Sequence, residues 1–129
     1  MFKINGQPIP KKNSMQIRYK NSAGRRVPFI AQNDRYKEYE ESAVWQLRTQ
    51  RQPIPNPPYN VKCVFYRKNR LRCDLVNLIE SVDDILTRAG IIPDDNFEIV
   101  AGHDGSRVLI DKENPRTEIE ITSIKERST

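Results

Sequence analysis

The strongest constraint on the fold is an apolar pattern that repeats with helical period between Leu75 and Ala89. At about 100° per residue, one arc of this segment collects Leu75, Leu78, Ile79, Val82, Ile85, Leu86 and Ala89. A second arc carries the polar side chains Asp74, Asn77, Ser81 and Asp84. Gly90 follows, and glycine is typical just after a helix C-terminus. The pattern predicts a helix over residues 75–89 with one face in the core and the other free for solvent or chemistry.

The segment before this helix has the features of a central β-strand. Residues 60–66 (NVKCVFY) are rich in β-branched and aromatic side chains that alternate along the chain. Shorter segments of the same kind predict strands at 2–8, 27–31, 97–101 and 117–122. The last two are separated by a polar stretch over residues 102–116, and Pro8 and Pro10 weaken the end of the first.

A second helix is expected in the N-terminal half, after a basic hairpin. Residues 11–26 contain the turn formers Asn21, Ser22 and Gly24, which predicts a flexible hairpin that leads into the strand at 27–31. Asn33 is a suitable N-cap for a helix over residues 34–50. Helical spacing there is kept by Tyr36, Tyr39, Ala43 and Leu47, and the helix is ended by Pro53, Pro55, Pro57 and Pro58.

These elements predict one α/β (α+β) domain over residues 1–129, with a mixed sheet of about four or five strands and two main helices. No stretch approaches the roughly 18 apolar residues of a membrane span, and the N-terminus lacks the apolar region of a signal peptide. Cys63 and Cys73 form no CxxC pair, so both are expected to be reduced thiols. We therefore expect a cytoplasmic protein with no membrane partner.

Charge is unevenly distributed along the chain, whose 22 Lys and Arg outnumber 17 Asp and Glu. Residues 1–38 hold nine basic side chains and two acids, and residues 62–72 add five basic side chains without an acid. Residues 74–98 then hold seven acids against Arg88 alone. Such runs are commonly solvated faces. The alternative is a nuclease, in which basic surface attracts phosphates and a carboxylate cluster holds divalent cations against them.

The acidic segment itself carries a distinctive order of residues: D-L-x-N-L from Asp74, then D-x-L-x-x-x-G from Asp84, then Asp94 and Asp95. This order resembles the signature of the RusA family of phage-type Holliday junction resolvases. The likeness is good over residues 70–98 and weaker over the G-x-P-x-P-K-K run at 6–12 and the final TEIEIT segment. It implies a homodimer that binds four-way DNA junctions and makes paired, symmetric, Mg²⁺-dependent cuts.

The resemblance also implies residue roles. Asp74 and Asp95 match catalytic carboxylates, Asp94 joins them as a metal ligand, and Asn77 and Asp84 match supporting positions. Two positions depart from the family pattern: Val76 stands where the family has a second catalytic Asp, and Glu80 where it has a Lys. Valine offers no lone pair to a metal, whereas Glu80, four residues further along the helix, lies within reach as a replacement ligand. Two hypotheses follow: an active resolvase with rearranged ligands, and a junction-binding protein without catalysis.

Contacts to DNA phosphates are expected from Lys11, Lys12, Arg18, Arg25, Arg26, Arg67, Lys68, Arg70 and Arg72. Tyr19, Tyr36, Tyr59 and Tyr66 either stack on unpaired bases or belong to the core or the sheet surface. Asp74 has the alternative role of a helix cap, and Asp94 with Asp95 that of an ordinary turn. His103 is expected to be a plain loop residue. A structural nucleic-acid binder that uses only the basic loop is the non-enzymatic alternative.

Overall fold

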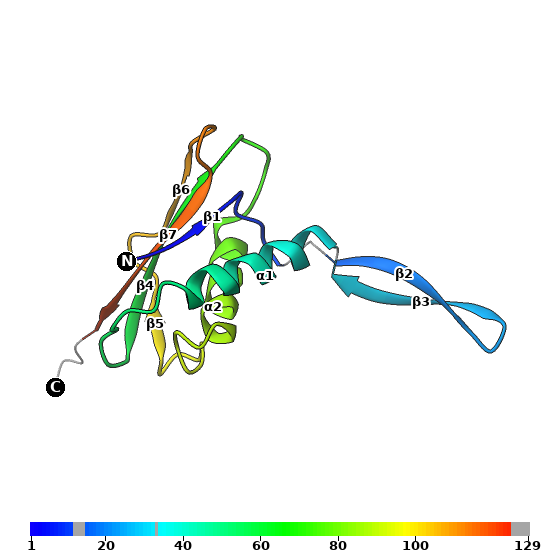
Figure 1. The fold of residues 1–129 in the computed structure, drawn as a ribbon, viewed down its shortest axis with the longest axis horizontal. Helices are drawn as coiled ribbons and strands as arrows, with labels where there is room; N and C mark the ends of the chain where they lie inside the picture. The colour runs from blue at the N-terminus through cyan, green and yellow to red at the C-terminus, as the bar shows by residue number, and fades with distance from the viewer. Residues whose placement is uncertain (12–14, 33, 125–129) are drawn as a thin grey trace.

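A mixed five-stranded sheet carries two helices on one face in the computed structural model (Figure 1), which describes residues 1–11, 15–32 and 34–124. The sheet consists of β1 (Phe2–Asn5), β4 (Tyr59–Arg67), β5 (Val100–Gly102), β6 (Arg107–Ile110) and β7 (Arg116–Ser123). The helices are α1 (Asp34–Arg48) and α2 (Leu75–Arg88), and a separate two-stranded sheet is formed by β2 (Met15–Ser22) and β3 (Arg25–Gln32). The predicted fold class is confirmed.

Strand β4 is central, as the sequence predicts. It pairs antiparallel with β7, from Tyr59 opposite Ser123 to Tyr66 opposite Arg116, and β7 in turn pairs with β1. On its other edge β4 runs parallel to both β5 and β6. This arrangement makes the sheet mixed, and it places the end of β4 beside β6 just before the chain enters α2.

The core lies between this sheet and the helices because alternate residues of β4 point to one face. Their side chains are fully or almost fully buried: Tyr59, Val61, Cys63 and Phe65. Helix α1 covers them with its predicted stripe of Tyr36, Tyr39, Ala43 and Leu47. Helix α2 adds Leu78, Val82, Ile85 and Leu86, all at most 1% exposed. Trp45, off the stripe on α1, is exposed.

The end of α2 is set by Gly90, as predicted. Its φ of +75° is in the left-handed region that favours glycine. The Gly90 N–H donates to the carbonyl of Thr87 over 3.1 Å, and the Ile91 N–H donates to the carbonyl of Leu86 over 3.0 Å. These two bonds are the Schellman pattern of a helix C-terminus, and they turn the chain into the loop that carries the acidic pair.

Strands β2 and β3 form an arm that projects away from the rest of the molecule (Figure 1). Ala23 and Gly24 join them, and both have positive φ, as a two-residue hairpin turn requires. The predicted basic hairpin is therefore present, but both of its halves are strands and the second begins at Arg25, two residues earlier than expected. The predicted N-cap Asn33 and the candidate DNA contact Lys12 lie outside the described residues.

Several other predicted elements differ from the structure. The first strand ends at Asn5, before the prolines, and the first helix ends at Arg48. The predicted strand at 97–101 is largely wrong: the N–H groups of Ile99 and Val100 donate to the carbonyl of Asn96 in a turn, and only Val100–Gly102 pairs with β4. The polar stretch 102–116 contains β6, which the sequence does not predict. Within the described residues, no helix has the length and apolarity needed to cross a membrane.

Candidate active site and nucleic-acid interface

Asp74 lies at the N-cap position of α2, directly after the basic loop that follows β4. Its backbone is extended (φ −82°, ψ 130°), and its side chain makes no capping hydrogen bond to the helix. The nearest polar contact is the Nδ2 of Asn77, which donates to Oδ2 of Asp74 over 3.4 Å. The carboxylate is exposed. Capping therefore does not account for Asp74, and its charge faces solvent beside the basic loop.

Asp94 and Asp95 lie in the exposed loop after α2. The Asp95 N–H and the Asn96 Nδ2 both donate to Asp94, each over 2.8 Å, and the bond from Asn96 is the main cause that lowers the pKa of Asp94. The pKa of Asp95 is raised, first by partial desolvation and then by the charges of Asp94 and Asp83. Asp95 thus lies close enough to Asp83, a buried residue of α2, for the two charges to interact.

The candidate carboxylates do not meet within one chain. Helix α2 has 14 residues and is about 21 Å long, and it separates Asp74 at its start from Asp94 and Asp95 after its end. Among the described residues, no group of three His, Cys, Asp or Glu side chains lies close enough together to hold a metal ion. Within residues 1–11, 15–32 and 34–124, the side chains of one chain therefore do not by themselves fit a Mg²⁺ site.

The two departures from the family pattern lie on the exposed side of α2. Val76 is 63% exposed, and it lies between Asp74 and Asn77 in the first turn. Glu80 is exposed one turn further along. An acidic side chain introduced at position 76 would therefore reach the solvent beside Asp74 without disturbing the core.

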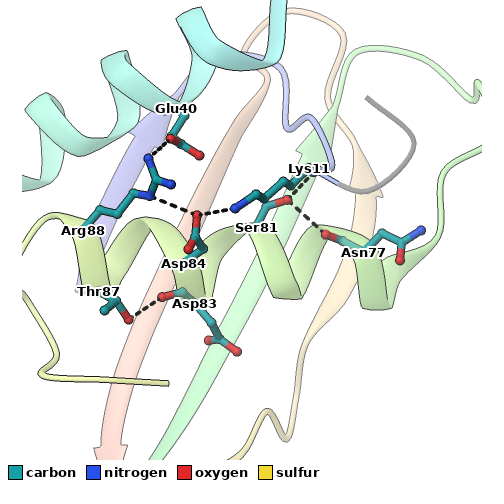
Figure 2. A network of polar contacts seen from close by, with 8 residues as sticks. All are labelled: Lys11, Glu40, Asn77, Ser81, Asp83, Asp84, Thr87 and Arg88. Atoms are coloured by element: carbon teal, nitrogen blue, oxygen red, sulfur yellow. Dashed lines mark hydrogen bonds and ion pairs between the residues drawn. The ribbon is translucent and has the colours of Figure 1, made fainter. Parts of the chain in front are cut away.

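Asp84 belongs to a charged network that ties three elements together (Figure 2). Its Oδ2 lies 3.2 Å from the Nζ of Lys11 and 3.3 Å from the Nε of Arg88, and Arg88 also pairs with Glu40 on α1. In the same region the Lys11 N–H donates to the Oγ of Ser81 over 2.6 Å. These contacts give Asp84 a structural role at the junction of the N-terminal segment with α1 and α2.

Asn77 and Ser81 are buried, although the sequence places them on the arc left for solvent or chemistry. The N-terminal segment at Lys11 packs over this part of α2. The Ser81 hydroxyl accepts a hydrogen bond from the Lys11 N–H and donates one to the Asn77 carbonyl (Figure 2). Asn77 keeps its side-chain amide toward Asp74. Its predicted supporting position is thus next to the candidate carboxylate.

Asp83, a buried residue of α2, pairs with His103, a partly exposed residue in the loop between β5 and β6. The Nε2 of His103 lies 2.8 Å from Oδ2 of Asp83, whose residue is only 8% exposed. The other carboxylate oxygen, Oδ1, is buried and has no hydrogen-bond partner among the described residues. Asp83 lies four residues after Ile79 and three before Leu86, at the edge of the apolar arc, and this spacing was the available signal for its burial. No local pattern points to His103.

Replacing His103 by alanine is expected to lower the free energy of unfolding by about 1–2 kcal/mol, because a buried carboxylate oxygen then loses its partner. His103→Gln is the matched control, since its amide can still donate to Asp83. Urea denaturation of the two variants and the wild type measures the difference. Equal stability of His103→Ala and the wild type would show that the pair contributes nothing to folding.

The candidate phosphate contacts divide into paired and exposed cations. Lys11 is held by Asp84, and a nitrogen of Arg18 lies 2.8 Å from Asp34. Arg25 and Arg26 are exposed near the turn of the arm, where the Arg26 guanidinium lies 4.2 Å from the centroid of the Tyr19 ring. Tyr19 is the exposed member of the four tyrosines, since Tyr36 and Tyr59 are core and Tyr66 lies under Arg116.

The loop after β4 gathers the remaining cations beside Asp74. Lys68, Arg70 and Arg72 are exposed. Arg70 and Arg72 line a hollow of about 300 Å³ together with Cys73 and with Arg67 at the end of β4. Burial raises the pKa of the Cys73 thiol, so it stays protonated at neutral pH. Basic side chains and an exposed carboxylate are thus placed within a few residues of each other, which suits a surface that holds phosphates near a reacting centre.

This chain was compared with models of known protein families. The family model described as Endodeoxyribonuclease RusA matches residues 5–122, which is nearly the whole chain. Among curated proteins no relative matches this chain.

Proposed function

Because the chain belongs to the RusA family of endodeoxyribonucleases, we propose that it is a structure-selective endonuclease that resolves Holliday junctions in DNA recombination and repair. The RusA-like domain spans residues 1–129 and acts as a homodimer on four-way junctions, with Mg²⁺ as the cofactor of cleavage. A DNA substrate and two reduced thiols support a cytoplasmic location.

The observation that carries this proposal is the exposed carboxylate of Asp74 at the end of a basic loop. Its charge is not used in a helix cap, and Arg70 and Arg72 precede it in the loop, where they line the hollow together with the adjacent Cys73. A divalent cation, when bound, supplies charge neutralisation and a water of lowered pKa for attack on a phosphodiester. The residues of this chain hold the DNA backbone against Asp74 and orient Asp74 through Asn77.

The direct test is a labelled four-way junction incubated with the purified protein in MgCl₂ or in EDTA. A linear duplex of the same sequence and length is the matched substrate control. We expect binding of the junction in both buffers, and two symmetric nicks in MgCl₂ alone. Absence of nicks in MgCl₂, with junction binding intact, would contradict the enzymatic proposal.

That outcome would support the alternative, a junction-binding protein without catalysis. Two observations favour this alternative: valine stands at position 76, where the family pattern has a carboxylate, and the described carboxylates of one chain do not group around a metal position. A structural binder holds DNA equally in EDTA and in MgCl₂ and never cleaves it. Metal dependence therefore separates the two functions in one experiment.

Exposed apolar side chains on the arm formed by β2 and β3 support the proposal of a homodimer. An isolated two-stranded hairpin is only marginally stable in water, yet this one extends from the body (Figure 1) and exposes Ile17 by 65% and Ile30 by 71%. A second copy of the chain offers apolar cover for these side chains, and two equivalent active sites related by a two-fold axis suit paired symmetric cuts. Sedimentation equilibrium at micromolar concentration tests this, and a strict monomer with and without DNA would contradict it.

Replacing both Arg25 and Arg26 by alanine is expected to weaken binding to junctions and duplexes alike. Each lost phosphate contact removes about one unit from the slope of log K against log salt, so the double variant is expected to lose about two units. Fluorescence anisotropy across a salt series measures the slope. Lys112→Ala, an exposed cation outside the candidate set, is the control. An unchanged slope would show that Arg25 and Arg26 of the arm do not contact DNA phosphates.

A further inference from the structure

The hollow beside Asp74 has a composition that phosphate binding alone does not explain. It lies between the loop after β4 and strand β6, has a volume of about 300 Å³, and is lined by Arg67, Arg70, Leu71, Arg72, Val108 and Ile110, among others. No carboxylate is among its described lining residues. Three of the eight lining side chains carry guanidinium groups, three are aliphatic, and the other two are Asn69 and Cys73. A free phosphate needs the first kind only.

Leu71 is presented to solvent by a loop that is held in place. The Leu71 N–H donates to Oδ1 of Asn69 over 3.1 Å, and the Leu71 carbonyl accepts a hydrogen bond from Nη1 of Arg67. Nearby, the Lys68 N–H donates to Oε1 of Gln7 over 2.8 Å. The Leu71 side chain is nevertheless 70% exposed. A fixed backbone thus holds an apolar side chain outward at the rim of the hollow, between Arg70 and Arg72.

Arg67 has an unused donor in this wall. Its Nε atom is buried and has no hydrogen-bond partner among the described residues. A buried donor without an acceptor costs free energy, so the Arg67 guanidinium is incompletely satisfied where it lines the hollow. Val108 and Ile110 of β6 contribute apolar side chains to the same hollow, and Ile110 lies opposite Arg67 in the strand register.

We propose that this hollow binds one unpaired base of branched DNA, with Leu71 wedged into the base stack that the base has left. Unpaired bases stack on guanidinium planes and apolar side chains, and aliphatic wedges such as leucine separate base steps. The volume is at the lower end of ligand pockets and suits a single base. A branch point offers unpaired bases more readily than a continuous duplex. The inference deepens the proposed function, on which it rests, by naming how the protein distinguishes branched from linear DNA.

The inference is tested by binding in EDTA, so that it does not depend on cleavage. The probe is a four-way junction with 2-aminopurine at the branch point, whose fluorescence rises when the base leaves the stack. The wild type is expected to raise the fluorescence several-fold. Ile110→Trp fills the hollow from a position that is already 42% exposed, and Leu71→Ala removes the wedge from an exposed loop position.

Both variants are expected to lose the fluorescence rise and to lower the ratio of junction to duplex affinity about tenfold, with duplex affinity unchanged. Leu109→Ala is the matched control, because Leu109 lies between the two lining residues of β6 and is also 42% exposed. Unchanged 2-aminopurine fluorescence in a wild-type complex with the junction would overturn the base site while leaving the proposed function standing. Ile110→Trp and Leu71→Ala variants that behave like the wild type would also overturn it. A wild type that binds no junction at all would overturn both.

Discussion

Asp74→Asn is expected to reduce the rate of junction cleavage by roughly 100-fold or more, because loss of even an outer-shell partner of a metal site costs 10- to 100-fold. Asparagine keeps the volume of the side chain and removes its charge. Since the Asp74 side chain is exposed and makes no capping bond, the substitution is expected to leave folding and junction affinity nearly unchanged. The measurement is single-turnover cleavage of a labelled junction in MgCl₂, with binding followed separately in EDTA.

Asp95→Asn is expected to behave in the same way, since Asp95 matches a catalytic carboxylate in the terminal Asp pair of the motif that this chain resembles. Glu113→Gln is the matched control, because it removes an exposed carboxylate outside the candidate site. Normal cleavage by Asp74→Asn or by Asp95→Asn would place the active site elsewhere. If both variants lose cleavage, a mixture of the two tests whether a dimer can assemble one intact site from both chains.

Val76→Asp is expected to raise cleavage about tenfold or more, because it restores the carboxylate that the family pattern has at this position. Its effect on stability is expected to be within about 0.5 kcal/mol, since Val76 is 63% exposed and an acid in the first turn interacts favourably with the helix dipole. Val76→Asn is the matched control, with similar volume and no charge. Cleavage rates as a function of MgCl₂ concentration separate tighter metal binding from faster chemistry.

The role of Glu80 is decided by the same series. If Glu80 replaces the missing ligand, Glu80→Gln abolishes cleavage and Val76→Asp restores it in the double variant. If Val76→Asp combined with Glu80→Lys, which restores both family residues, still leaves an inactive protein, the hypothesis of a near-intact RusA-like metal site in this chain is wrong.

Much of the fold could be predicted from local patterns. The alternation in residues 60–66 and the helical spacing of Leu78, Val82 and Leu86 describe which face of each element is buried, and the structure confirms both. Strand β6 could not be predicted because its four residues, RVLI, become a strand only through parallel pairing with β4. The prediction of a strand at Phe97 is wrong because it assumes that this apolar side chain packs against the sheet, whereas the side chain is 80% exposed.

For the site, the sequence is sufficient to name the candidate residues: Asp74 before α2, the acidic pair after Gly90, and the basic loop. The resemblance to the family adds the departures at Val76 and Glu80. Their placement depends on the packing of the whole chain. Packing separates the acids to the two ends of α2, pairs Asp83 with His103 across 20 residues, and joins the basic loop to β6 in one hollow. The reason is that side-chain periodicity is set by the local backbone. Distances between residues far apart in the chain depend instead on how helices and strands pack.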